Sequence, residues 1–258
     1  MTHQIDPHDA DLAELFDLDY GDFREDIPFY EGLAQQTGGP ILELGVGTGR
    51  VALPLAGRGY DVVGVDNSEA MLALARCKAG DAPNVEFLFG DMRDFSIDHS
   101  FGLVYAGYGA FHHLLGPADQ LACLQCVERH LAPDGVFAFD LRAIFATDWD
   151  GGDSAPLLHD WTRTTADGDV ITKLRSVRVD RAAQVQHEMY YFDRVGQDGS
   201  LRRVSTNVDL RFSTRYEIEA LLREASLELD QLYGDYALSP YDGDSDLMIT
   251  IARKPVNP

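Results

Sequence analysis

Ten residues decide the fold: Ile41-Leu42-Glu43-Leu44-Gly45-Val46-Gly47-Thr48-Gly49-Arg50, where an apolar strand runs directly into three closely spaced glycines. Glycines at alternate positions permit positive φ and remove the Cβ atoms that would keep a ligand away from the backbone. An apolar, helix-like segment follows over residues 49–57. This stretch predicts a strand–loop–helix turn that binds a ligand.

The spacing of the glycines distinguishes this loop from two other nucleotide-binding loops. The dinucleotide fingerprint has its third glycine three residues after the second, and Arg50 stands at that position. A P-loop ends in Gly-Lys-Ser/Thr, but the first lysine of the chain is Lys78. An NAD-dependent oxidoreductase and an ATP- or GTP-using enzyme are therefore disfavoured.

Two further strands end in acidic residues. The strand at 60–65 ends in Asp66, seventeen residues after Gly49. A carboxylate at such a strand end can accept hydrogen bonds from both hydroxyls of a ribose. The strand at 85–89 leads into Gly90-Asp91-Met92. The order and spacing of these segments predict a nucleoside-binding edge.

Together these segments resemble the class I S-adenosylmethionine-dependent methyltransferases, closely over residues 11–141 and loosely beyond. Residues 43–49 match the first motif of that family, Asp66 matches its ribose-binding acid, and Asp91-Met92 matches its adenine-contacting pair. The cofactor is then S-adenosyl-L-methionine. The resemblance implies that the cofactor is bound by Tyr20, Arg24, Glu43, Gly45, Gly47, Gly49, Asp66, Met71, Asp91, Met92 and Tyr108.

Strands that alternate with helical segments predict an α/β fold with a doubly wound, mostly parallel sheet. The expected strands of this Rossmann-like core are 41–44, 60–65, 85–89, 101–106 and 136–141. A helix from Pro117 to Leu131 ends before a turn at 133–135. Ligands of such sheets gather at the carboxyl ends of the strands.

A change to period-two alternation after Leu157 predicts antiparallel strands. These strands are expected at 170–179, 184–195 and 201–212, as an insertion before the last helix. That helix begins with the capping-box sequence Thr214-x-x-Glu217. We therefore expect four regions: a helical lid over 1–40, a cofactor-binding core over 41–150, an antiparallel insertion over 151–212, and a last helix and two strands over 213–258.

The lid is predicted from apolar residues at helical spacing over 11–34, read as two short helices interrupted at Pro28. In the resembling family such a segment folds over the cofactor. Tyr20 and Arg24 would then lie near the methionine moiety, with Arg24 paired to its carboxylate. A helical hairpin packed on the sheet, with Arg24 in solvent, is an equally open alternative.

The net charge and composition of the chain argue against some classes of binding partner. The net charge is −22 over 258 residues, with a pI near 4.5, so the surface repels nucleic acid and anionic membranes. No apolar run approaches the roughly 18 residues of a membrane span, and the acidic N-terminus does not resemble a signal sequence. We expect a cytoplasmic monomer or homodimer that acts on a small-molecule methyl acceptor.

Neither the cysteines nor the histidines predict a metal site. Cys123 and Cys126 have C-x-x-C spacing but lie inside an apolar helical pattern without a second pair. With Cys77 the cysteines are odd in number, and the scattered histidines lack metal-ligand spacing. We expect Cys123 and Cys126 to be buried structural residues.

The candidate catalytic residues are His112, His113 and Tyr20, with Tyr108 as a polar contact. The cofactor's sulfonium is an activated methyl donor, so the enzyme mainly orients a nucleophile and keeps it deprotonated. His113 is the preferred base, because His113-Leu114 matches a pair found here in several small-molecule members of the family. A structural role for both histidines is an equal alternative, and Arg142 either binds an anionic group of the acceptor or is solvated.

Two further stretches, residues 90–95 and 130–133, resemble amino-sugar N-methyltransferases of antibiotic pathways. The Asn-Pro-Pro-Tyr motif of enzymes that methylate amino groups of nucleic acid and protein is absent, and Ala106-Gly107-Tyr108-Gly109 stands there. The sequence predicts methyl transfer to a small-molecule amine or hydroxyl, with C-methylation still open. The alternative is a cofactor-binding regulatory protein of the same fold without catalysis.

Overall fold

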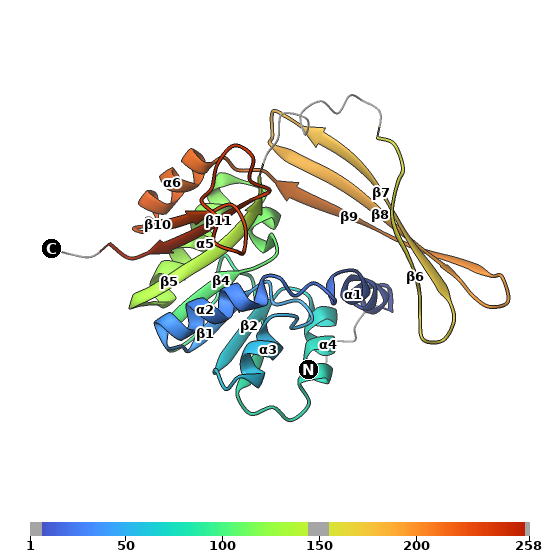
Figure 1. Cartoon of the computed structure of the whole chain (residues 1–258), viewed down its shortest axis with the longest axis horizontal. Coiled ribbons are helices and arrows are strands. Elements are labelled where there is room, and N and C mark those ends of the chain that lie inside the picture. Colours follow the sequence, from blue (N-terminus) through green and yellow to red (C-terminus); the bar gives the residue numbers. More distant parts are fainter. Residues whose placement is uncertain (1–6, 144–154, 256–258) are drawn as a thin grey trace.

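The computed structural model of the chain describes residues 7–143 and 155–255. Residues 1–6 of the expected lid, the expected boundary at 150–151 and residues 256–258 lie outside this range. Two sheets form the framework, and they differ in strand direction and in burial (Figure 1).

The first sheet has seven strands in the order β10-β11-β5-β4-β1-β2-β3. Its pairs are parallel except those made by β11, which runs antiparallel to β5 and β10. The bounds are β1 Ile41–Leu44, β2 Val62–Asp66, β3 Val85–Phe89, β4 Phe101–Ala106, β5 Leu131–Arg142, β10 Glu228–Tyr233 and β11 Leu247–Arg253. This arrangement confirms the predicted doubly wound, mostly parallel sheet.

One expected turn lies inside a strand. Residues 133–135 belong to β5, which begins at Leu131 instead of the expected residue 136. Phe101 pairs with Leu131 but Leu103 pairs with Val136, so the Pro-Asp-Gly segment bulges out of the ladder. A bulge accommodates the turn residues without ending the strand.

Helices pack against the first sheet and between the two sheets (Figure 1). They are α1 Pro7–Tyr20, α2 Ile27–Thr37, α3 Ala52–Gly57, α4 Glu69–Ala79, the 3₁₀ turn η1 Ala110–His113, α5 Pro117–His130 and α6 Arg215–Glu224. The two helices expected before the first strand are confirmed as α1 and α2. The break between them lies at residues 21–26 and not at Pro28, because proline suits the first turn of a helix and Pro28 lies in the first turn of α2. The capping box of α6 is confirmed, since the Thr214 N–H donates to Glu217 at 2.6 Å.

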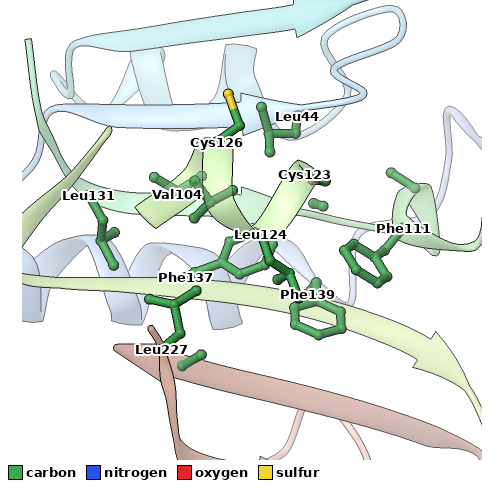
Figure 2. Close-up of a cluster of buried hydrophobic side chains, with 14 of the residues drawn as sticks. Leu44, Val104, Phe111, Cys123, Leu124, Cys126, Leu131, Phe137, Phe139 and Leu227 are labelled. Carbon is green, nitrogen blue, oxygen red and sulfur yellow. The ribbon is translucent and has the colours of Figure 1, made fainter. Parts of the chain in front are cut away.

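The core beside α5 explains the C-x-x-C spacing. Cys123 and Cys126 are fully buried free thiols of α5 in the same core cluster as Phe137 and Phe139 of β5, with the Cys126 side chain directed toward Leu44 of β1 (Figure 2). The two phenylalanine rings stack at 5.0 Å between centroids. Burying each such ring contributes roughly 1.5–3 kcal/mol, so the cysteines fill a helix–sheet interface, as predicted.

The second sheet contains four antiparallel strands in the order β6-β7-β8-β9 and extends away from the core (Figure 1). Its strands are β6 Leu158–Thr164, β7 Val170–Asp180, β8 Val185–Val195 and β9 Leu201–Arg211. The antiparallel insertion is confirmed, but the sequence predicted only three of these strands. β6 was missed because its pairing shifts register between His159 and Trp161, which breaks the period-two alternation.

Candidate active site

A cavity of about 730 Å³ opens at the carboxyl ends of β1, β2 and β4. Small-molecule sites typically measure roughly 300–1,000 Å³. The predicted site residues that line it are Tyr20, Glu43, Gly45, Gly47, Asp66, Met71, Asp91, Met92, Tyr108, His112 and His113. The lining does not include Arg24, Gly49 or Arg142. The fold therefore brings together most of the residues selected from three distant motifs.

The three loop glycines have different surroundings. A Cβ at Gly45 would lie 2.9 Å from the Cβ of Ala110, and one at Gly49 would lie 3.1 Å from Leu53. Gly47, at φ 54°, would place a Cβ with no protein atom within 4 Å. Gly45 and Gly49 thus permit close packing of the protein, whereas Gly47 leaves room on the cavity side for a ligand.

Asp66 joins β2 to the glycine loop. Its Oδ2 accepts the Gly47 N–H at 2.8 Å, and its Oδ1 accepts the Ser68 N–H at 2.8 Å. Burial raises the pKa of this carboxyl, and the backbone N–H groups oppose the rise. An ionised carboxylate has about four acceptor positions, so Asp66 can still accept hydroxyls of a bound ribose.

Glu43 lies at the end of β1 and is nearly fully buried. The Tyr105 hydroxyl donates to its Oε2 at 2.8 Å. Burial raises the pKa of Glu43 from 4.5 to about 8, although the hydrogen bond from Tyr105 favours the ionised form. The cavity therefore has a carboxyl group that holds its proton near neutral pH.

Asp91 is paired within the protein. Arg93 bonds Asp91 at 2.6 Å and lowers its pKa, and the same guanidinium bonds Asp119 at 2.7 Å. These three side chains form an ion-pair cluster where the loop after β3 meets the first turn of α5.

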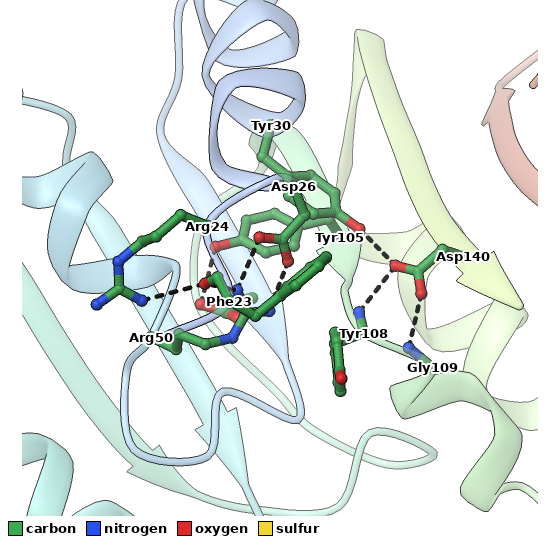
Figure 3. A network of polar contacts seen from close by, with 10 residues as sticks. Phe23, Arg24, Asp26, Tyr30, Arg50, Tyr105, Tyr108, Gly109 and Asp140 are labelled. Carbon is green, nitrogen blue, oxygen red and sulfur yellow. Dashed lines mark hydrogen bonds and ion pairs between the residues drawn. The ribbon is translucent and has the colours of Figure 1, made fainter. Parts of the chain in front are cut away.

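Arg50, and not the predicted Arg24, lines the cavity. Arg24 is exposed and donates to the Phe23 carbonyl, outside the cavity lining. Arg50 lines the cavity and makes two bonds, at 2.7 and 2.5 Å, to the buried Asp26 (Figure 3). Its guanidinium also lies 5.1 Å from the Tyr108 ring centroid. Sequence reasoning noted Arg50 only as the replacement for a glycine, although it is the one cation of the loop.

Asp140 is a second residue that sequence reasoning missed. Its carboxylate accepts the Tyr108 and Gly109 N–H groups at 2.8 and 2.7 Å and the Tyr30 hydroxyl at 2.8 Å (Figure 3). Burial raises its pKa to about 6. These bonds hold Tyr108 at φ 53°, a conformation that non-glycine residues rarely adopt. The available signal was a single charge inside the apolar strand at 136–141.

His112 and His113 differ in their surroundings. The His112 ring nitrogens are both engaged, Nδ1 with the Arg211 carbonyl at 2.6 Å and Nε2 with the Arg142 N–H at 2.9 Å. Burial lowers the pKa of His112 to about 4. His113 presents an accessible ring to the cavity. The surrounding protein lowers its pKa as well, and the Asp66 charge partly opposes this.

Helix α1 carries Tyr20 into the cavity and is bonded on two sides. Toward the second sheet, Asp19 accepts bonds from Lys173 at 2.5 Å and from the Trp161 Nε1 at 2.6 Å. Toward the core, Asp17 bonds Lys78 and accepts the Thr48 hydroxyl at 2.7 Å. Of the expected lid, helix α1 therefore lies between the two sheets, whereas α2 packs against the first sheet.

The second sheet also supplies part of the cavity wall, which was not predicted from the sequence. Its contribution comes from Tyr190 of β8 and from Thr206, Asn207, Val208 and Leu210 of β9. Arg142 lies outside this wall, with its guanidinium 5.3 Å from the Phe212 ring centroid.

Residues 7–143 and 155–255 lack two features. No helix in these ranges has the length and apolar character needed to cross a membrane. The same ranges contain no group of three or more His, Cys, Asp or Glu side chains placed to hold a metal ion.

Known proteins similar to this chain include methyltransferases, which agrees with a cofactor site at the glycine loop. Residues 41–135 match the family described as methyltransferase domain. The matched segment is a methyltransferase domain, and the comparisons indicate an S-adenosylmethionine-dependent methyltransferase whose cofactor is S-adenosylmethionine.

Three relatives are informative. The cypemycin N-terminal methyltransferase of a Streptomyces species is 28% identical over 217 residues, which is 84% of each chain. The dTDP-3-amino-3,6-dideoxy-alpha-D-glucopyranose N,N-dimethyltransferase of Streptomyces fradiae is 32% identical over 136 residues, 50% of this chain and 52% of the relative. The solved structure of the CcbJ methyltransferase of Streptomyces caelestis has a TM-score of 0.75 at 27% identity, covering 92% of this chain and 90% of that one.

Proposed function

We propose that this methyltransferase transfers the methyl group of S-adenosylmethionine to the nitrogen of a small-molecule amine. The observation that carries the proposal is the single cavity in which His113 and Tyr20 share one space with Gly47 and Asp66. One relative is named as an N,N-dimethyltransferase of an amino sugar and another as an N-terminal methyltransferase, and both names support nitrogen over oxygen or carbon as the methyl acceptor.

The core side of the cavity fits the cofactor. Gly47 leaves space against the loop backbone, and Asp66 has acceptor positions for the ribose hydroxyls. Arg50 uses three of its five N–H donors on Phe23 and Asp26, so it retains donors for the methionine carboxylate. We assign this contact to Arg50 in place of Arg24.

The residues near β4 and η1 would prepare the acceptor. Bound S-adenosylmethionine supplies a methyl group activated on a sulfonium. The acceptor nitrogen must be neutral and oriented toward that methyl group. His113 is open to the cavity and its lowered pKa keeps the ring neutral at pH 7, so it can accept a proton from the acceptor ammonium.

His112 acts as a positioning residue in this scheme. Its ring connects the Arg211 carbonyl at the end of β9 with the Arg142 N–H at the end of β5. The two bonds fix η1 and so determine where His113 meets the cavity.

Turnover of paired compounds tests the proposal. The protein would be incubated with S-adenosylmethionine and amines matched to hydroxyl analogues, and both the demethylated cofactor and the product mass would be measured. We expect methylation of amines, and a loss of about 10²–10⁴ in maximal rate for His113→Ala with nearly unchanged cofactor affinity. Methylation of the hydroxyl analogues alone would contradict N-methylation, and cofactor binding without turnover of any acceptor would favour the regulatory alternative.

A further inference from the structure

The cavity has two chemically different sides. The core side contains the glycine loop and Asp66, while the opposite wall comes from β8 and β9 of the second sheet. The side chains on that wall are uncharged: Tyr190, Thr206, Asn207, Val208 and Leu210. If the cofactor occupies the core side, as the proposed function requires, this wall faces the acceptor.

Acidic side chains outnumber basic ones in the lining. Five carboxyl groups line the cavity: Asp17, Glu43, Asp66, Asp91 and Asp119, of which Glu43 holds its proton near neutral pH. Two guanidiniums accompany them, and both are bonded to carboxylates. Arg50 is held by Asp26, and Arg93 is held by Asp91 and Asp119. An excess of carboxylates in a concave site raises the local concentration of cations and lowers that of anions.

Beyond the lining, Lys78 pairs with Asp17, and the carboxylates at the cavity still outnumber the cations. Residues 1–6, 144–154 and 256–258, which lie outside the described ranges, contain no lysine or arginine. The first turn of α5 borders the cavity, and helix N-termini commonly bind phosphate. That turn already contains Asp119 with its partner Arg93.

Aromatic rings complete the acceptor side. Tyr20 lies 5.0 Å from Tyr108 and 6.0 Å from Phe16, between ring centroids, and Phe16 lies 6.3 Å from Tyr190. All four residues line the cavity, and they come from α1, the loop after β4, and β8. Aromatic faces attract ammonium groups, most strongly where water is excluded.

We propose that the acceptor of this enzyme is an amine that carries no phosphate or nucleotide and that binds between these aromatic rings and the uncharged wall of β8 and β9. This acceptor class differs from the dTDP-linked amino sugar in the name of the Streptomyces fradiae relative. A diphosphate would bring two or more negative charges into a cavity whose carboxylates outnumber its cations. The charges of the Arg50 and Arg93 guanidiniums are already paired with carboxylates.

Matched probes test the inference on the full chain. D-glucosamine and D-glucosamine 6-phosphate are compared as methyl acceptors in the presence of S-adenosylmethionine, with dTDP at millimolar concentration as an inhibitor. In thermal unfolding, dTDP is tested as a stabiliser of the chain loaded with the demethylated cofactor. We expect kcat/KM for the unphosphorylated amine to exceed that of its phosphate by roughly tenfold or more, as for juxtaposed like charges, and no stabilisation or inhibition by dTDP.

Charge reversal of one residue of the cavity lining, Asp119 in the first turn of α5, sharpens the test. Asp119→Lys should raise the relative use of the phosphorylated amine or create stabilisation by dTDP, whereas Asp134→Lys, an exposed site outside the lining, should not. Equal use of both amines by the unaltered enzyme, or stabilisation of it by dTDP, would overturn the inference. Failure of the demethylated cofactor to bind would instead overturn the proposed function, so the two failures are distinguishable.

Discussion

Helix α1 is attached to the second sheet and to the core by ion pairs that differ in burial. The side chains of Lys173 and Asp19, on the sheet side, are 5% and 6% exposed. Those of Lys78 and Asp17, on the core side, are 31% and 28% exposed. An exposed pair contributes about 0–1 kcal/mol, whereas removing one partner of a buried pair costs about 3–5 kcal/mol. We therefore expect α1 to move with the second sheet when the cofactor enters or leaves.

The core side has the Arg50–Asp26 ion pair, but unlike the sheet side it also buries carboxyl groups whose hydrogen bonds come from neutral donors. On the sheet side, the Asp19 carboxylate is paired with a cation and accepts a bond from an indole N–H. On the core side, Asp66 and Asp140 accept backbone N–H groups, and Glu43 accepts a hydroxyl. Hydrogen bonds from neutral donors offset the cost of burying an ionised carboxylate less completely than a neighbouring cation does. Burial therefore raises the pKa of Asp66, Asp140 and Glu43. The free energy of unfolding should therefore depend on pH through the core-side carboxyl groups. On the sheet side it should depend on the presence of the cation that pairs with Asp19.

Removing the buried cation should have the largest effect. Lys173→Met leaves Asp19 buried without its charge partner, so the free energy of unfolding should fall by about 3–5 kcal/mol in urea denaturation. Lys254→Met, which removes a more exposed lysine paired with Glu128, should cost about 0–1 kcal/mol. The double variant Lys173→Met/Asp19→Asn should recover part of the loss. If Lys173→Met and Lys254→Met lowered the free energy of unfolding equally, the buried ion pair would be worth no more than an exposed one.

The second prediction concerns Glu43 and pH. The folded-state pKa of about 8 lies above the ordinary 4.5, so the folded protein holds this proton more tightly than the unfolded chain. That contribution to the free energy of unfolding is complete below pH 4.5 and is lost as the pH rises through 8. Since one pKa unit corresponds to about 1.4 kcal/mol, Glu43→Gln should gain on the order of 1–4 kcal/mol relative to the unaltered protein over this range.

Urea denaturation of both proteins between pH 5 and 8 provides the measurement. Asp140 also titrates in this range, with a pKa of about 6, but it is present in both proteins and cancels in the difference. A pH-independent difference between the two proteins would show that Glu43 is ionised throughout.

The third prediction separates cofactor affinity from stability on the core side. Asp66→Ala should weaken binding of the demethylated cofactor by several-fold to hundreds-fold, because hydrogen bonds to a charged group contribute about 1.5–3 kcal/mol. Calorimetry gives the affinity, with Asp61→Ala, a carboxylate outside the cavity lining, as the control. Unchanged affinity in Asp66→Ala would exclude this residue from the ribose site.

Features of the core side differ in how far they could be predicted from the sequence. The glycine loop, Asp66 and Asp91 were recognisable because each lies within a few residues of a strand end, where local pattern and spacing suffice. Arg50 and Asp140 were missed because their partners, Asp26 and the Tyr108 loop, lie more than twenty residues away.

The wall formed by the second sheet could not have been predicted in the same way. Period-two alternation identified β8 and β9 as strands, but alternation gives two faces and does not say which one another element covers. The contact of α1 with this sheet, through Lys173 and Asp19, depends on the packing of segments more than 150 residues apart. The same holds for Tyr190, whose place in the cavity follows from that packing.

The smallest effect on the free energy of unfolding is expected at the exposed Asp17–Lys78 pair. Breaking this pair should instead change the rate at which the demethylated cofactor is released. Asp17→Asn removes the charge that pairs with Lys78 but keeps an oxygen that can accept the Thr48 hydroxyl. The free energy of unfolding should change by about 0–1 kcal/mol. Thr48 belongs to the glycine loop, so weakening this contact should let α1 part from the core more often and speed release of the demethylated cofactor severalfold in stopped-flow measurements. Asp134→Asn serves as the matched exposed control. If Asp17→Asn leaves the release rate unchanged while Lys173→Met raises it, α1 instead parts from the second sheet, and the order of the two attachments is reversed.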